Sequence, residues 1–127
     1  MTSPHSIPRT TLITGASSGI GLELAKLFAK DGHPLVLVAR SAENLDKLAR
    51  DLATQHKTSV TCIPVDLSQP GAAQRLVEEL QQRSITIDIL VNNAGFGMHG
   101  KFASAAWSEF DAMLQVYVEA NARAEAE

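Results

Sequence analysis

The segment Thr14-Gly-Ala-Ser-Ser-Gly-Ile-Gly21 has the residue types and spacing best suited to binding a ligand. It follows a short apolar run and precedes a stretch of helical periodicity, which predicts a glycine-rich turn between a strand and a helix. Such a turn directs several backbone N–H groups and the positive end of the helix dipole toward one point, where phosphate binds well. We expect Gly15 to allow the tight turn, Gly19 to let an anion approach the backbone and Gly21 to let the helix pack closely.

The same residues also fit a second chemistry. Gly15-Ala-Ser17-Ser-Gly19 matches G-x-S-x-G, the nucleophile elbow of α/β-hydrolases, in which a serine lies on a strand-to-helix turn. That interpretation needs a later acid and a histidine, for which Asp66 and His99 are the candidates. It leaves the third glycine unexplained, and the chain is short for that fold, so phosphate binding is the favoured hypothesis.

Four short apolar or β-branched runs predict strands, and helical periodicity separates them. The runs are bounded by turn residues and lie at Thr10–Thr14, Pro34–Ala39, Ser59–Val65 and Ile85–Asn92. Near-continuous hydrophobicity, as in Leu35-Val-Leu-Val38, is typical of strands buried on both faces of a parallel sheet. Strand–helix–strand repeats with short loops predict right-handed crossovers and a doubly wound α/β sheet.

Three helices are expected between the strands, at Ser18–Lys30, Ala42–His56 and a third segment with Ser68 as its N-cap. The residues expected to face inward are Ile20, Leu24, Leu27 and Phe28, then Leu45, Leu48, Ala49 and Leu52, then Ala73, Leu76, Val77 and Leu80. From Ala105 a further helix is expected, with an apolar stripe of Trp107, Phe110, Leu114, Tyr117 and Val118. The end at 119–127 alternates alanine with polar residues, so it is expected to be helical and to bury little.

Composition argues against several classes of function. A single domain is expected from 127 residues of which 45% are hydrophobic, with residues 1–8 as a flexible tail. The net charge of −3 gives no electrostatic support for binding nucleic acid or an anionic membrane. The longest apolar run, Leu35–Ala39, is too short to span a bilayer, and Met1–Arg9 lacks the apolar region of a signal peptide.

The remaining residues that could react are interpreted structurally. Cys62 is the one cysteine, so it cannot form an internal disulfide and fits a reducing cytoplasm. Within a predicted strand, it is expected to be a small buried hydrophobe. The four histidines lack ligand spacing, so no metal site is expected. Glu43, Asp46 and Lys47 are interpreted as a solvated helix face.

Four landmarks in register resemble one family, the short-chain dehydrogenases/reductases. They are the glycine segment, Arg40 after the second strand, Val65-Asp66-Leu67 after the third and Asn92-Asn-Ala-Gly95 after the fourth. The resemblance covers roughly residues 8 to 118. It implies a Rossmann-like half of three layers, in which a four-stranded parallel sheet of order 3-2-1-4 is flanked by helices.

The resemblance also implies a dinucleotide site. Gly15, Gly19, Ile20 and Gly21 would surround the pyrophosphate, with Ser18 part of the same segment. Asp66 would accept a hydrogen bond from the adenine amino group, and Leu67 would supply a backbone contact. Asn93 and Ala94, with Gly95 after them, would line the cofactor pocket and brace the central strands.

Arg40 decides the cofactor within that resemblance. Members that bind NAD carry an acidic residue at the end of the second strand, whereas a guanidinium there suits a ribose 2′-phosphate. Ser17 and Ser41 could add hydroxyl contacts. NADP(H) is therefore favoured over NAD(H). The alternatives are that Arg40 is an ordinary solvated cation and that Asp66 is an N-cap or loop carboxylate.

The chain departs from the family in its catalytic residues. The family uses a tyrosine with a lysine four residues later, and an upstream serine that polarises the carbonyl. Here the one tyrosine is Tyr117, which is followed four residues later by Asn121 and stands where the family has an asparagine. A tyrosine without a neighbouring cation is a poor base at neutral pH. No catalytic residue is therefore assigned, and Tyr117 is interpreted as packing.

The predicted half-domain would leave the fourth strand as an apolar edge, which is a template for pairing with another chain. We expect that edge and the Trp107–Val118 stripe to be covered in a two-fold homodimer. Three functions stay open. They are a non-catalytic NADP(H)-binding half-domain, a self-assembling structural module without useful cofactor affinity, and an oxidoreductase whose site is completed by another chain.

Overall fold

The computed structural model describes residues 7–17, 19–66, 69–93 and 112. Its four strands are β1 (Thr11–Thr14), β2 (Leu35–Ala39), β3 (Val60–Pro64) and β4 (Ile89–Asn92). They form one parallel sheet in the order β3-β2-β1-β4, as the sequence predicts. The five residues of the predicted stripe (Trp107, Phe110, Leu114, Tyr117 and Val118), the end at 119–127 and most of the predicted N-terminal tail lie outside the described residues.

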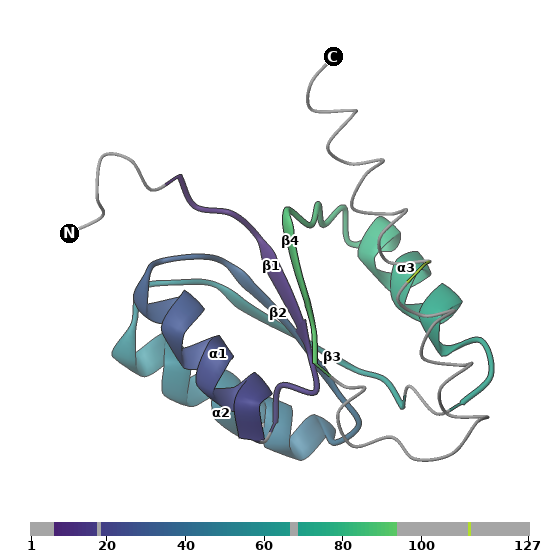
Figure 1. Ribbon diagram of the computed structural model, residues 1–127, viewed down its shortest axis with the longest axis horizontal. Coiled ribbons are helices and arrows are strands. Elements are labelled where there is room, and N and C mark those ends of the chain that lie inside the picture. Colours follow the sequence, from purple (N-terminus) through teal and green to yellow (C-terminus); the bar gives the residue numbers. More distant parts are fainter. Residues whose placement is uncertain (1–6, 18, 67–68, 94–111, 113–127) are drawn as a thin grey trace.

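Helices cover both faces of the sheet, which gives the predicted three layers. The helices α1 (Gly19–Lys30) and α2 (Ala42–Gln55) lie together on one face, and α3 (Ala72–Gln82) lies on the other (Figure 1). Each helix follows a strand and precedes the next one, so every connection crosses from one parallel strand to another. No helix among the described residues is both long enough and apolar enough to cross a bilayer.

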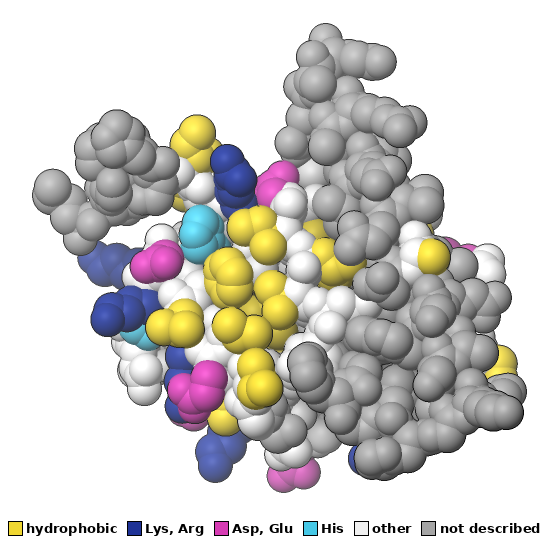
Figure 2. All heavy atoms as spheres, viewed as in Figure 1, with side chains coloured by type: hydrophobic (Ala, Val, Ile, Leu, Met, Phe, Trp, Pro, Cys, Tyr) yellow, Lys and Arg dark blue, Asp and Glu magenta, His cyan; other side chains and the backbone are white. Residues whose placement is uncertain are grey.

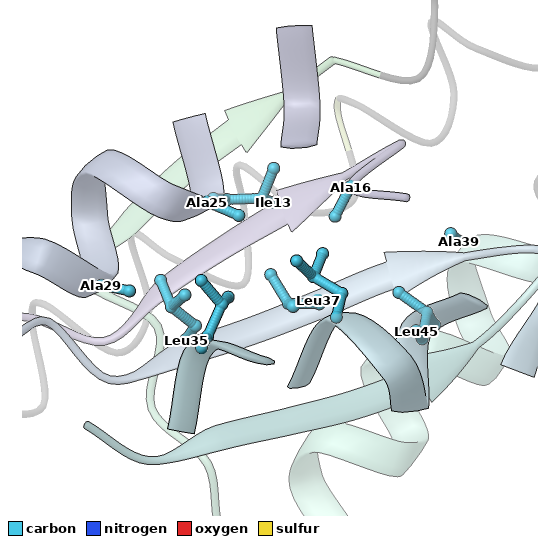
Figure 3. Close-up of a cluster of buried hydrophobic side chains, with 10 residues drawn as sticks. Ile13, Ala16, Ala25, Ala29, Leu35, Leu37, Ala39 and Leu45 are labelled. Atoms are coloured by element: carbon cyan, nitrogen blue, oxygen red, sulfur yellow. The ribbon is translucent and has the colours of Figure 1, made fainter. Parts of the chain in front are cut away.

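The core divides in two because successive side chains of a strand point to opposite faces. Ile13, Leu35 and Leu37 point toward α1 and α2, where they pack with buried residues of both helices (Figure 3). Leu12, Val36 and Val38 point the other way and pack with residues of α3. Both central strands are buried on both faces, which confirms the prediction drawn from their continuous hydrophobicity.

The face of α1 that meets the sheet differs from the prediction. Its buried residues are Gly21, Ala25 and Ala29, one turn apart, whereas Ile20 and Leu27 are each 59% exposed. The expectation that Ile20 and Leu27 face inward is therefore wrong. Small side chains let the helix axis approach the sheet closely, and the bulky residues are displaced to the flanks. Leu24 and Phe28 are partly buried against the core, as expected of inward residues.

The other two helices follow the predicted pattern with shifted ends. Leu45, Leu48 and Leu52 of α2 and Leu76 and Leu80 of α3 are buried as expected. Their neighbours Ala49, Ala73 and Val77 are partly buried, and Ala72 is buried in addition. The third helix begins after Gly71, at φ +76°, and not directly after Ser68, which lies outside the described residues.

The fourth strand is shorter than predicted. Pairing with β1 begins at Ile89 opposite Thr11, because the chain before it makes a different set of contacts. The backbone N–H groups of Asp88 and Ile89 both donate to the Thr10 carbonyl, at 2.9 and 3.1 Å. The Asp88 carboxylate in turn accepts from the Thr10 N–H at 2.9 Å. Residues 85–88 therefore form a connection and not a strand.

Cys62 is half-buried and packs against the core, so the expectation of a small buried hydrophobe is met only in part. It lies on β3, an outer strand of the described sheet, and its thiol donates to the Leu45 carbonyl at 3.4 Å. Burial, and then the nearby Asp46 carboxylate, raise the pKa of the Cys62 thiol above its usual value. The thiol is therefore uncharged at neutral pH, and a neutral thiol is a weak nucleophile.

Candidate functional site

The sheet register brings the four sequence landmarks to one edge. Thr14, the last residue of β1, pairs with Val38 of β2 on one side and Asn92 of β4 on the other. Ala39 of β2 pairs with Pro64 of β3. The segments that follow these residues leave the sheet at its carboxyl edge, with neighbouring strands about 4.8 Å apart. A ligand at this edge could therefore reach several of the landmarks at once.

The glycine segment forms the predicted turn between β1 and α1. Gly15 and Gly19 have φ angles of +64° and +58°, in the region that favours glycine. The Ala16 N–H donates to the Val38 carbonyl at 3.3 Å, which holds the turn against the neighbouring strand. Gly19 is exposed, and a Cβ atom built on it would meet nothing within 4 Å beyond its chain neighbours and its own helix backbone, so the N-terminus of α1 is open to a ligand.

The electrostatics of this open end favour an anion. The first turn of α1 contains no acidic residue, so no carboxylate of its own neutralises the positive end of the helix dipole. The N–H groups of a first helical turn lack partners within the helix and can donate to a ligand. The geometry fits a pyrophosphate group held by the segment from Gly15 to Gly21.

Gly21 is the point of closest packing in the site. A Cβ atom on Gly21 would overlap the carbonyl oxygen of Gly15 and would lie 2.7 Å from the side-chain nitrogen of Asn93. That same nitrogen donates to the Gly15 carbonyl at 3.3 Å. The absence of a side chain therefore lets α1, the turn and the end of β4 meet in one place. We call this contact of Gly15, Gly21 and Asn93 the glycine corner.

Thr14 supports the glycine corner through hydrogen bonds to the end of β4, a role that was not predicted from the sequence. Its side chain is fully buried, and its hydroxyl donates to the Asn92 side-chain oxygen at 2.9 Å. The same hydroxyl accepts from the Asn93 N–H at 2.9 Å. The available signal was a polar residue ending a buried strand, with a pair of asparagines ending another.

Arg40 and Ser41 follow β2 and form a second, more exposed part of the site. Arg40 is exposed and makes no ion pair within the described part of the chain. The Ser41 hydroxyl caps α2 by accepting from the Asn44 N–H at 3.2 Å. Because a hydroxyl can donate while it accepts, this cap leaves the Ser41 proton available for a phosphate oxygen.

Asp66 lies just beyond β3 at the same edge and is partly buried. Its carbonyl accepts from the Gln69 N–H at 3.1 Å, which places it at the start of a turn. Of the predicted site residues, Ser18, Leu67, Ala94 and Gly95 lie outside the described residues. The remaining ones all lie at or next to the carboxyl edge of the sheet.

The geometry gives no support to the nucleophile-elbow interpretation. A nucleophile elbow places its serine on a strained turn, but among the non-glycine residues that the structure describes, Ser84 alone has a positive φ. Ser17 follows β1 and Asp66 follows β3, and β2 lies between those strands. No group of three metal-ligating side chains occurs in the described ranges.

Comparison with known proteins agrees with this geometry. The sequence pattern of the family described as short chain dehydrogenase matches residues 9–124. The chain belongs to the short-chain dehydrogenase family. It is 39% identical over 94 residues to the bovine protein named dehydrogenase/reductase SDR family member 7B, covering 70% of this chain and 29% of that protein. It is 34% identical over 118 residues to mouse 3-ketodihydrosphingosine reductase, covering 89% and 36%. The chain thus spans less than half the length of these relatives.

Solved structures of short-chain dehydrogenases share the fold. L-sorbose reductase from Gluconobacter frateurii, complexed with NADPH and L-sorbose, matches with a TM-score of 0.81 and 32% identity. The match covers 93% of this chain and 49% of the reductase. A short-chain dehydrogenase from Sphingobium yanoikuyae in complex with NADPH matches with a TM-score of 0.75 and 35% identity, covering 88% and 47%. Both structures contain the same type of dinucleotide.

Proposed function

We propose that this chain is an NADP(H)-binding half of a short-chain dehydrogenase fold. The observation that carries the proposal is the open N-terminus of α1, which has no acidic residue and follows a glycine turn tied to Asn93. This arrangement supplies N–H donors and a positive dipole to a pyrophosphate. The NADPH complexes of two related structures support the same assignment.

The assigned roles follow from position along the edge. Gly15, Gly19, Ile20 and Gly21, with Ser18, hold the pyrophosphate. Asp66 and Leu67 contact the adenine, and Asn93, Ala94 and Gly95 line the inner part of the pocket. The preference for NADP(H) over NAD(H) rests on Arg40, whose exposed guanidinium at the end of β2 makes no ion pair with the described residues and suits a 2′-phosphate. Ser17 and Ser41 would add hydroxyl donors.

We further propose that these 127 residues alone do not transfer hydride. The one tyrosine, Tyr117, has Asn121 four residues later and so lacks the lysine that activates the family's tyrosine. The expected result is no NADPH oxidation with a panel of ketones, followed as absorbance of the reduced nicotinamide. Turnover that disappears on Tyr117→Phe would establish the opposite and give that residue a catalytic role.

The exposed flank of α1 supports self-association as a homodimer. Apolar side chains gather over α1 on the surface (Figure 2), and Leu27, away from the phosphate-binding end of the helix, is 59% exposed. Strand β4 pairs with β1 on one side within the described sheet, so its other side is an edge. Both features suit a two-fold interface, in which the same apolar surface meets its own copy.

Light scattering tests the dimer with a charge placed on the flank. Leu27→Lys is expected to convert the dimer to monomer, because an ammonium group buried in an apolar interface has no partner. Ile7→Lys is the matched control, since Ile7 is 71% exposed and lies on a different segment. A dimer that survives Leu27→Lys unchanged would exclude this flank, and a monomeric parent chain would exclude the homodimer.

We propose that the protein is located in the cytoplasm. The single cysteine of the sequence, Cys62, is consistent with that reducing compartment.

Calorimetric titration with NADP⁺ and then NAD⁺ tests the cofactor proposal directly. Saturable heat with tighter binding of NADP⁺ is the expected result. A folded chain that gives no heat with either dinucleotide would leave the structural module as the function. Equal affinity for the two would retain the pyrophosphate assignment and remove the role given to Arg40.

A further inference from the structure

A groove between α1 and α2 leads away from the phosphate-binding edge. Its volume is about 420 Å³, and it begins beside Ser17. Leu22 and Lys26 of α1 form one wall. The α2 wall comes from residues three or four apart, so one face of that helix lines the groove: Asn44, Lys47, Leu48, Asp51, Leu52 and Gln55.

Position along α2 decides which cation lies near the site. Both helices begin at the carboxyl edge of the sheet, because each follows a parallel strand. Asn44 bonds to the Ser41 cap, so it marks the end of the groove next to Arg40. At 1.5 Å per residue, Lys47 is about one turn from Asn44, whereas Gln55 is roughly 16 Å away.

The two lysines of the groove differ in their partners. Lys26 pairs with Glu23 of its own helix at 3.4 Å. Lys47 makes no ion pair within the described part of the chain, although Glu43 and Asp51 lie one turn before and after it on α2. Its charge is therefore available to a ligand, and its long stem can extend toward Ser17 at the head of the groove.

We propose that Lys47 is a specificity residue for the ribose 2′-phosphate of NADP(H). The inference rests on the proposed function and adds a second cation to Arg40 from a different element. Arg40 approaches the phosphate from the end of β2, and Lys47 approaches it from the second turn of α2. The sequence alone indicated that Lys47 belongs to a solvated helix face. The proposal gives Lys47 a role in binding in addition.

The test compares Lys47→Gln with Lys26→Gln by calorimetry, using NADP⁺, NAD⁺, 2′,5′-ADP and AMP as probes. Lys47→Gln is expected to weaken NADP⁺ and 2′,5′-ADP about three- to fivefold, as for an exposed ion pair, and to leave NAD⁺ and AMP within twofold. Lys26→Gln is expected to change none of them. Lys47→Arg keeps the charge and is expected to retain the parent affinity, and the weakening by Lys47→Gln should diminish at high salt.

Any other result contradicts either the role of Lys47 or the proposed function, and the measurements distinguish the two. Parent binding of NADP⁺ with no change in Lys47→Gln, or with equal loss for NAD⁺, overturns the role of Lys47 and leaves the proposed function intact. An equal effect of Lys26→Gln replaces a specific contact by the general charge of the groove. Absence of saturable binding of NADP⁺ and 2′,5′-ADP by the folded parent chain overturns the proposed function, and the role of Lys47 falls with it.

Discussion

The glycine corner is held by packing and partly buried hydrogen bonds, whereas the corner formed by Arg40 and Lys47 consists of exposed side chains that make no ion pair with any described residue. In the first, Gly21 touches the turn at Gly15, and the Asn93 amide closes the contact. In the second, which we call the arginine corner, the Ser41 cap is the one side-chain hydrogen bond that the described residues show. The proposed pyrophosphate site is thus part of the fold, while the proposed choice between cofactors depends on side chains that can change without disturbing the fold.

Gly21→Ala breaks the glycine corner and should have the largest effect. A methyl group has no room beside the Gly15 carbonyl, so overpacking should lower the free energy of unfolding by about 3 kcal/mol, with weakened binding of both dinucleotides. Chemical denaturation and calorimetry measure the two effects. Gly71→Ala is the control, because Gly71 lies at φ +76° with open space around it and should cost only about 1 kcal/mol of backbone strain. Equal losses in both variants would mean that the glycine corner is not tightly packed.

Arg40→Ala tests the arginine corner alone. It should weaken NADP⁺ about tenfold through loss of a charge-assisted contact, with little change for NAD⁺ or for stability. Competitive titration of both dinucleotides measures the ratio, and Arg50→Ala on the exposed surface of α2 is the matched control. If NAD⁺ weakens as much as NADP⁺, the guanidinium does not select the 2′-phosphate.

Thr14→Val sharpens the comparison by removing one hydroxyl and keeping the shape. The Asn93 N–H and the Asn92 side-chain oxygen each lose a buried partner, so stability should fall by about 1–2 kcal/mol. Thr14→Ser retains the hydroxyl and should recover most of that loss. The two melting curves would coincide if the hydroxyl contributes nothing, and the glycine corner would then depend on packing alone.

The sheet was predictable because its sequence signals are local. Continuous apolar runs mark β1 and β2, and the four landmarks each follow a strand. The packing of α1 was not predictable, because periodicity identifies an apolar stripe on a helix but not which side of that stripe meets the sheet. Gly21, Ala25 and Ala29 take that place because close approach needs small residues, which leaves Ile20 and Leu27 outside.

In the candidate site too, some residues could be predicted from local sequence and others could not. Residue types suffice to predict a phosphate turn at Gly15 and a cation at Arg40, because both follow directly from a strand end. The Thr14 hydroxyl and the Lys47 side chain need the register and the helix pair, since their neighbours are far away in sequence. Thr14 meets Asn92 across 78 positions, a contact that no local pattern contains.

Strand β1 has a consequence for how the molecule loses its structure. All four of its residues are fully excluded from solvent, and strands pair with it on both sides. Amide protons in such a strand exchange with deuterated water only when the whole domain opens, whereas those at sheet edges exchange through local fluctuations. The glycine turn is attached directly to β1, where the slowest exchange is expected. On gentle heating, the anchor of the proposed phosphate site should therefore remain in place after the outer strands of the sheet have begun to fray.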